Sequence, residues 1–128
     1  MEKKELELYI HIPFCVKKCN YCDFLSFPAD EDTQTAYVTA LKKEIAFYGN
    51  RMKDRRISTI YIGGGTPSWL TERSMASILQ QVYDSFEVAA DAEISIECNP
   101  GTIAEAKFVS YRQSGINRLS IGLQSPDN

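Results

Sequence analysis

Three cysteines stand close together near the start of the sequence, at Cys15, Cys19 and Cys22. Their spacing, C-x3-C-x2-C, is short enough for one loop to bring three thiolates to a single iron–sulfur cluster. A ferredoxin supplies four thiolates to its cluster, whereas three thiolates leave one iron of a four-iron cluster without a protein ligand. An open metal position is what a catalytic site needs. The spacing therefore predicts a cluster that binds a further ligand.

A zinc site is the alternative interpretation of the same cysteines. His11 lies four positions before Cys15 and would complete a Cys3His ligand set. However, His11 belongs to the run YIHIP, in which apolar residues alternate as they do along a strand. Because a strand fixes the direction of its side chains, we regard the zinc site as the weaker interpretation.

A second candidate segment is glycine-rich and runs GGGTP over residues 63–67. Glycines let backbone N–H groups approach a ligand closely, and successive N–H groups can form an anion-binding nest. The same run would also suit an ordinary turn between a strand and a helix. The residues alone leave both interpretations open.

Two polar residues, Glu97 and Gln124, lie near the ends of later predicted strands. A carboxylate that points into a protein interior is costly to bury without a partner. A ligand cation or hydroxyl group would satisfy Glu97, and an ion pair with Arg118 is the alternative.

Short apolar runs alternate with longer amphipathic segments along the chain and predict the elements that position these residues. Strands are predicted at residues 7–13, 57–62, 93–98 and 118–123. Helices are predicted at residues 33–50, after a Thr71 N-cap up to Phe86, and from Thr102 to just before Gly115. The first helix is expected to bury Tyr37, Leu41, Ile45 and Tyr48, and the second Met75, Ile78, Leu79, Val82 and Phe86.

The predicted order β-α-β-α-β-α-β calls for parallel strands with crossover helices. Side chains alternate along a strand, and every predicted strand has one aliphatic face and one polar or small face. A doubly wound sheet is covered by helices on both faces and should be apolar on both. The alternation therefore predicts an α/β fold that forms part of a TIM-like (β/α) barrel, with the polar faces lining its interior.

The same alternation separates the fourth cysteine, Cys98, from the other three. Cys98 follows Glu97 directly, so the two side chains are expected on opposite faces of the strand. We interpret Cys98 as a small buried hydrophobic residue and not as a cluster ligand.

Length and composition set limits on function. A complete (β/α)8 barrel takes about 250 residues, so we expect residues 1–128 to be the N-terminal part of a longer core domain. A net charge of −3 offers no basic field for nucleic acid, and no run is apolar enough to predict a transmembrane helix. The start of the chain lacks a signal peptide, which predicts a cytoplasmic protein.

The motifs YIHIPFC, GGGTPS, ECNPGT and NRLSIGLQS occur in this order between Leu8 and Ser125. Together with the cysteine spacing, and with the aromatic Tyr21 before the last cysteine, they resemble the radical S-adenosylmethionine (SAM) superfamily. Within it they look like the coproporphyrinogen III oxidase-like branch, which includes HemN-type oxidases and HemW-type heme chaperones.

The resemblance implies a 4Fe–4S cluster on Cys15, Cys19 and Cys22, whose open iron chelates SAM. It also implies heme or porphyrin and an electron donor protein as partners. The residues that it implies for cofactor binding are Tyr9, Tyr21, Gly64, Gly65, Thr66, Glu97 and Gln124.

The residues after the third cysteine distinguish the two kinds of relative. HemN-type oxidases, which decarboxylate the propionates of coproporphyrinogen III, continue as C-G-C, whereas this chain has Cys22-Asp23-Phe24. The sequence C-D-F looks more like the HemW-type chaperones, which bind heme and pass it on. The resemblance therefore favours a heme chaperone, with an oxygen-independent coproporphyrinogen III oxidase as the alternative and enzymatic activity left open.

Overall fold

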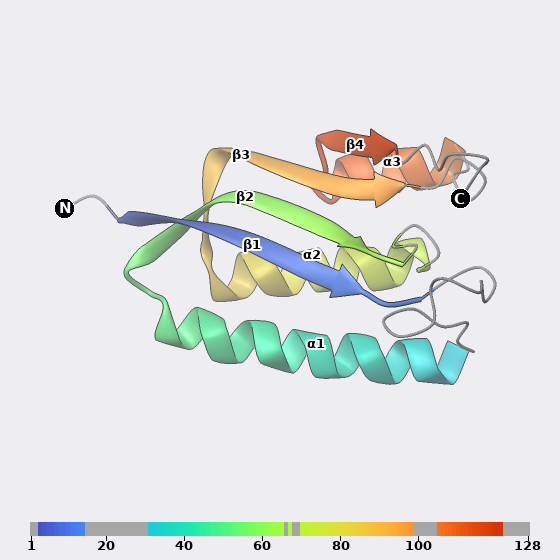
Figure 1. Cartoon of the computed structure of the whole chain (residues 1–128), viewed down its shortest axis with the longest axis horizontal. Coiled ribbons are helices and arrows are strands. Elements are labelled where there is room, and N and C mark those ends of the chain that lie inside the picture. The colour runs from blue at the N-terminus through green and yellow to red at the C-terminus, as the bar shows by residue number, and fades with distance from the viewer. Residues whose placement is uncertain (1–2, 15–30, 66, 68–69, 99–104, 122–128) are drawn as a thin grey trace, which may run out of the picture.

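The computed structural model describes residues 3–14, 31–65, 67, 70–98 and 105–121. Strands and helices alternate in the order that the sequence predicts (Figure 1). The elements are β1 (Lys4–Ile12), α1 (Glu31–Arg51), β2 (Arg55–Gly64), α2 (Glu72–Ser85), β3 (Glu87–Cys98), α3 (Glu105–Gln113) and β4 (Arg118–Ile121).

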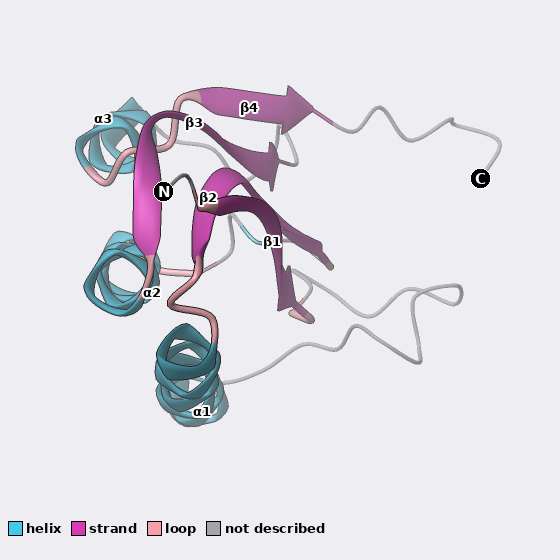
Figure 2. Ribbon diagram, turned by 90° about the vertical axis from the view of Figure 1, so that its left-hand side faces the viewer, coloured by secondary structure: helices cyan, strands magenta, loops and turns pink. Residues whose placement is uncertain are grey.

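The strands form one parallel sheet in the order β1-β2-β3-β4. All three described helices lie on the same side of this sheet, which leaves the other side uncovered by helices (Figure 2). We call these two sides the helix face and the open face. This arrangement confirms the prediction of an α/β fold with part of a (β/α) barrel, because a doubly wound sheet would carry helices on both sides.

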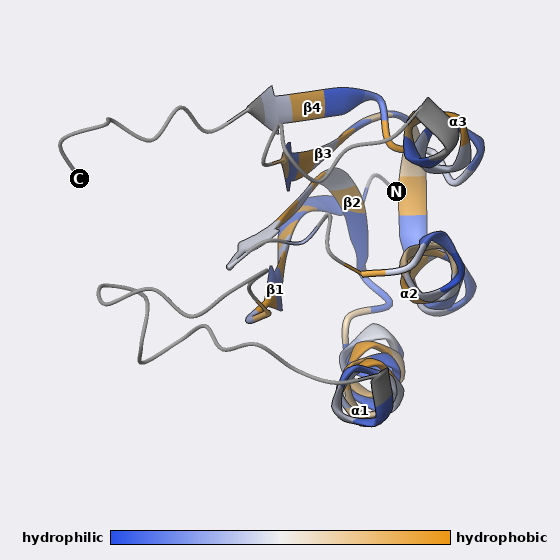
Figure 3. Ribbon diagram, turned by 90° about the vertical axis from the view of Figure 1, so that its right-hand side faces the viewer, coloured by the Kyte–Doolittle hydropathy of each residue, from blue (hydrophilic) through white to orange (hydrophobic). Residues whose placement is uncertain are grey.

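The hydrophobic core lies between the sheet and the helices. Toward the carboxyl end of each long strand, every second residue enters it, so hydrophobic and hydrophilic bands alternate along the strands (Figure 3). The buried hydrophobic strand residues are Ile10, Ile12, Ile57, Ile60, Ile62, Ala92, Ile94, Ile96 and Cys98, and α2 adds Met75, Ile78, Leu79 and Val82. The predicted strand faces are therefore confirmed, including the position of Cys98.

Two helix ends follow the predicted capping chemistry. The Thr71 hydroxyl group accepts a hydrogen bond from the Ser74 backbone N–H at 3.1 Å and caps α2. At the other end of the next helix, Gly115 has a φ of +104°, a left-handed conformation that ends α3 as predicted. The predicted start at Thr102 lies outside the described residues.

The third strand begins earlier than predicted, at Glu87 and not at residue 93. Val88 pairs with Ile57, but the next pair in the ladder is Thr59 with Glu93, so the residues between them have no partner on β2. This irregular part of β3 is Ala-Ala-Asp-Ala, whose low strand propensity gave no signal in the sequence.

The buried face of α1 differs from the prediction at one end. Tyr48 is 45% exposed and packs edge-to-face on its neighbour Phe47, which is exposed as well. Val38 and Ile45 are buried, and Tyr37 and Leu41 pack against the core. Tyr48 instead lines a groove beside β1 together with Leu8 and Met52, so its ring is only partly covered.

Candidate functional site

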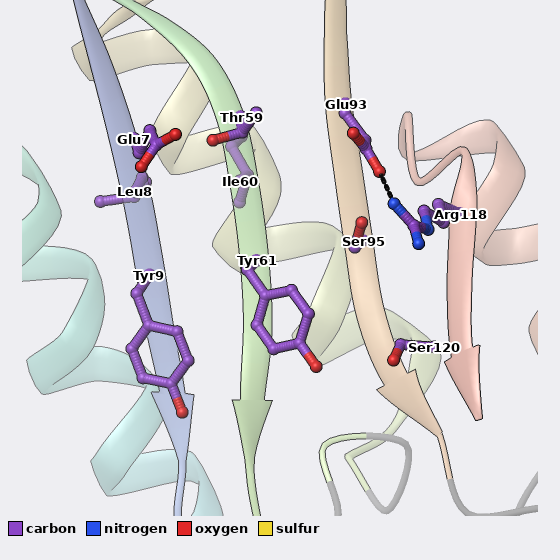
Figure 4. Close-up of a pocket in the computed structure, with 10 residues that line it drawn as sticks. All are labelled: Glu7, Leu8, Tyr9, Thr59, Ile60, Tyr61, Glu93, Ser95, Arg118 and Ser120. Carbon is purple, nitrogen blue, oxygen red and sulfur yellow. Dashed lines mark hydrogen bonds and ion pairs between the residues drawn. The ribbon is translucent and has the colours of Figure 1, made fainter. Parts of the chain in front are cut away.

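The open face carries aromatic and polar side chains toward the carboxyl ends of the strands. Tyr9 of β1 is paired in register with Tyr61 of β2, and Tyr61 with Ser95 of β3. Alternation turns these side chains away from the core, and Tyr9 is 56% exposed. Figure 4 shows the two tyrosine rings side by side over neighbouring strands.

The glycine-rich segment joins the ends of β1 and β2. The Gly65 N–H group donates to the Ile12 carbonyl oxygen at 2.8 Å. Gly64 has a φ of +122°, and a Cβ atom there would lie 2.4 Å from the same carbonyl oxygen and 3.0 Å from the His11 ring. Glycine is required at this position for both reasons. The close contact places the segment beside Ile12, three residues before Cys15 in the sequence.

A series of contacts runs from this segment across the open face to Glu97. His11 Nδ1 and the Tyr9 hydroxyl oxygen are 3.2 Å apart, and the Tyr9 and Tyr61 rings lie nearly parallel with centroids 6.0 Å apart. The Tyr61 hydroxyl group donates to Glu97 Oε2 at 3.1 Å. The series links the ends of β1, β2 and β3.

The electrostatics of the site keep the Tyr9 hydroxyl group protonated. Partial burial raises the pKa of Tyr9, and the negative charge of Glu97 and the neighbouring Tyr61 raise this pKa further. The hydroxyl group therefore stays a hydrogen-bond donor at neutral and mildly alkaline pH. An aromatic donor and a carboxylate acceptor lie within one contiguous site.

Cys98 has the opposite environment, although it neighbours Glu97 in sequence. Burial raises the pKa of the Cys98 thiol to about 11, an effect that the Glu97 charge strengthens and that of Lys107 weakens. The thiol is a protonated core group, whereas a metal ligand must be a thiolate.

A hollow of about 430 Å³ adjoins the two tyrosines on the side of the amino ends of the strands (Figure 4). Its polar lining includes Glu7, Thr59, Ser95 and Ser120, together with the ion pair between Glu93 and Arg118. The predicted alternative in which Arg118 pairs with Glu97 is therefore wrong. Arg118 lies opposite Ser95 in the ladder, so Glu93 and Glu97 are both near it on the same face of β3. Arg118 pairs with Glu93, whereas Glu97 accepts a hydrogen bond from Tyr61.

Four of the residues expected to bind cofactor are described, and the structure brings them to one edge of the open face. They are Tyr9, Gly64, Gly65 and Glu97. Tyr21, Thr66 and Gln124, like Cys15, Cys19 and Cys22, lie outside the described residues. Within the described ranges, no three His, Cys, Asp or Glu side chains are grouped so that they could hold a metal ion.

Tyr61 was not predicted as a site residue, and Gly63 was predicted only as part of the glycine-rich segment. A Cβ atom on Gly63 would lie 2.8 Å from Tyr61 Cε1 and 3.1 Å from the Tyr9 hydroxyl oxygen. Strand alternation already placed Tyr61 on the same face as Tyr9, but it could not show which residues are opposite each other. The register of β1 with β2 was the missing information.

None of the helices in the described part of the chain is long and apolar enough to cross a membrane.

Comparison with known proteins gives concordant matches in sequence. Residues 9–128 match the sequence profile of the Radical SAM superfamily. The chain is 45% identical over 126 residues to the heme chaperone HemW of Escherichia coli, which covers 94% of this chain and 32% of that protein. It is 41% identical over 121 residues to the heme chaperone HemW of Buchnera aphidicola subsp. Schizaphis graminum, with the same two coverages.

A solved structure matches the fold as well. The chain superposes on coproporphyrinogen III oxidase (HemN) from Escherichia coli, described as a radical SAM enzyme, with a TM-score of 0.86 and 34% sequence identity. The match covers 98% of this chain and 29% of the HemN chain. The chain thus spans about a third of the length of the relatives that it matches.

Proposed function

Because this chain belongs to the radical SAM superfamily, we propose that it binds a 4Fe–4S cluster on Cys15, Cys19 and Cys22, and SAM beside it. The family implies both cofactors. The observation that carries the assignment of residues is the contact series that joins Gly64, His11, Tyr9, Tyr61 and Glu97. Gly64, at the start of this series, lies beside Ile12, which precedes Cys15 by three residues in sequence.

The described residues fit SAM chemically. The Glu97 carboxylate can accept hydrogen bonds from an ammonium or hydroxyl group, and the exposed face of Tyr9 suits a cationic sulfonium group. Glycines at 63–65 keep β carbons out of the space where a ligand would approach the backbone. We propose that Tyr21, Thr66 and Gln124 complete this SAM site.

The cysteines fit the cluster by the chemistry of the donor set. Three thiolates are the protein ligands that leave one iron open. When bound, the cluster supplies one-electron reduction of SAM, which requires an electron donor protein. The task of this chain is to hold the thiolates and to orient SAM.

We propose further that the whole protein is a heme chaperone of the HemW type, which binds heme as well as SAM. The support comes from Asp23 and Phe24 after the third cysteine and from the names of the HemW relatives at 41–45% identity. The structural match to HemN supports the alternative, oxidative decarboxylation of coproporphyrinogen III. For either function, residues 1–128 would be the N-terminal part of the radical SAM core domain. This fits the match to about a third of the length of the relatives.

Iron analysis tests the cluster. After anaerobic reconstitution of the intact protein, we expect iron and labile sulfide in equal amounts, and loss of both in Cys15→Ala, Cys19→Ala and Cys22→Ala. Cys98→Ala is the matched control and should keep both, because its thiol is buried on the helix face. Zinc in place of iron, or equal iron loss in the Cys98 variant, would contradict the proposal.

A second assay separates the two activities. The intact, cluster-loaded protein should bind heme in a saturable titration and should not consume coproporphyrinogen III in the presence of SAM and a reductant. Turnover of coproporphyrinogen III without heme binding would favour the oxidase.

A further inference from the structure

We infer that Tyr61 is a positioning residue of the SAM site, which holds the Glu97 carboxylate through its hydroxyl group and supports Tyr9 through its ring. The inference rests on the proposed function, because it assumes that Glu97 and Tyr9 contact the ligand. Tyr61 itself would act through these two residues.

The hydrogen bond to Glu97 depends on the register of β2 with β3. Tyr61 is opposite Ser95, and Glu97 is the next residue on the same face of β3. Diagonal neighbours in a sheet are within reach of an aromatic side chain. Ser95 is small, so the Tyr61 ring can pass beside it, and the hydroxyl group reaches Glu97 Oε2 at 3.1 Å.

The ring contact depends on Gly63. Tyr9 and Tyr61 lie opposite each other in the ladder, and their rings are inclined by only 13°. Any Cβ atom on Gly63 would lie within 3.2 Å of both tyrosines and 2.8 Å from Tyr61 Cε1. The absence of a side chain at Gly63 therefore lets the two rings lie flat over the strand ends, as Figure 4 shows for the rings themselves.

The consequence is a carboxylate whose orientation is set before the ligand arrives. The hydrogen bond to Oε2 leaves the lone pairs of Oε1 to accept from an ammonium or hydroxyl group of SAM. A side chain that is already ordered loses less conformational entropy on binding. Tyr61 should therefore affect the affinity for SAM only while Glu97 carries its carboxylate.

A double-mutant cycle tests this dependence. SAM is titrated anaerobically by calorimetry into the intact, cluster-loaded protein with Tyr61→Phe, Glu97→Gln or both. We expect Tyr61→Phe to raise the Kd about three- to tenfold, the usual range for one hydrogen bond. In the Glu97→Gln background the same change should have a smaller effect, because the amide oxygen accepts only a neutral hydrogen bond from Tyr61 and the carboxylate that Tyr61 orients is gone.

Tyr83→Phe is the matched control. Tyr83 also donates one hydrogen bond, to the Ser114 carbonyl oxygen at 2.6 Å, but it does so from α2. Its removal should leave the Kd for SAM unchanged, and Tyr61→Phe should leave the thermal unfolding midpoint near that of the wild type.

The outcomes separate the inference from the proposed function. An unchanged Kd in Tyr61→Phe, or an equal effect of Tyr61→Phe with and without Glu97, would overturn the inference if Glu97→Gln alone weakens binding. An unchanged Kd in Glu97→Gln would overturn the proposed SAM site itself.

Discussion

The two faces of the sheet are built from the same strands but follow different rules. On β3, Ile94, Ile96 and Cys98 are at most 4% exposed in the helix-covered core, whereas Glu93 and Glu97 alternate with them on the open face. A parallel sheet is usually apolar on both faces. The polar side chains on one face here indicate that this face does not pack against helices.

The helix face supplies the stability. Ile62, Leu79 and Ile96 are fully buried, and burial of such a side chain contributes about 1.5–3 kcal/mol relative to an exposed one. The open face contributes little in comparison, because its ion pair between Glu93 and Arg118 is exposed to solvent. Its side chains are instead ordered by contacts with each other, which suits a binding site.

The largest effect should come from a cavity on the helix face. Leu79→Ala in α2 removes a fully buried side chain and should lower the free energy of unfolding by about 2–5 kcal/mol. The Kd for SAM should stay within about twofold of the wild type, since that face does not contact the proposed site. Urea unfolding and calorimetry measure the two quantities, with the exposed neighbour Gln80→Ala as control. A large loss of SAM affinity in folded Leu79→Ala would contradict the separation of stability on the helix face from binding on the open face.

The next largest effect should come from Gly64→Ala. Gly64 is the last residue of β2 and lies beside the end of β1. A side chain at a φ of +122°, with its Cβ atom 2.4 Å from the Ile12 carbonyl oxygen, should cost about 1–3 kcal/mol of stability. The displaced backbone should also weaken SAM binding.

Gly115→Ala is the matched control for this prediction. Gly115 also has a positive φ, and a Cβ atom there would meet the Tyr83 hydroxyl oxygen, but it lies at the end of α3. The Gly115→Ala variant should lose a similar amount of stability and keep its affinity for SAM. Equal loss of affinity in both variants would mean that the effect of Gly64 is only structural.

A smaller effect should appear at alkaline pH. The pKa of the Cys98 thiol is raised to about 11 in the folded protein, from an ordinary value of 9.0. A raised pKa stabilises the fold below pH 9, and this stabilisation is lost as pH rises toward 11, because the unfolded thiol ionises first. The free energy of unfolding should therefore fall by about 1 kcal/mol between pH 8 and pH 10 through this group.

Cys98→Ala isolates that contribution. Urea unfolding of this variant should show a shallower decrease between pH 8 and pH 10 than the wild type. An identical decrease in both proteins would show that Cys98 does not account for the pH dependence.

Much of the fold could be predicted from the sequence, because hydrophobic periodicity reports directly on burial. The alternation in the strands gave the correct face for Ile10, Ile62, Ile96 and Cys98, and Thr71 capped α2 as expected. The early part of β3 could not be predicted, since residues 89–92 lack partners on β2 and carry no strand pattern. The prediction that Tyr48 is buried was wrong because its exposure depends on how α1 sits beside the edge strand β1, which is a property of the assembled fold.

The candidate site was only partly accessible to sequence reasoning. The family resemblance selected Tyr9, Gly64, Gly65 and Glu97 as cofactor residues, and the structure brings these four to one edge of the open face. The contact of Tyr61 with Glu97 depends on strand register, which a single sequence does not encode in any local pattern. The ion pair of Arg118 with Glu93 was missed for the same reason.

Two adjacent residues offer the most direct test, because Glu97 and Cys98 are neighbours in sequence that lie on opposite faces of the sheet. SAM affinity, iron content and the free energy of unfolding are measured for Glu97→Gln and Cys98→Ala in the intact, cluster-loaded protein. We predict that Glu97→Gln raises the Kd for SAM about tenfold with little change in stability, since it weakens a charged hydrogen bond. Cys98→Ala should lower stability by about 1 kcal/mol and leave iron and SAM binding intact. SAM affinity that is unchanged in Glu97→Gln, or lost in Cys98→Ala, would contradict the assignment of function to the open face.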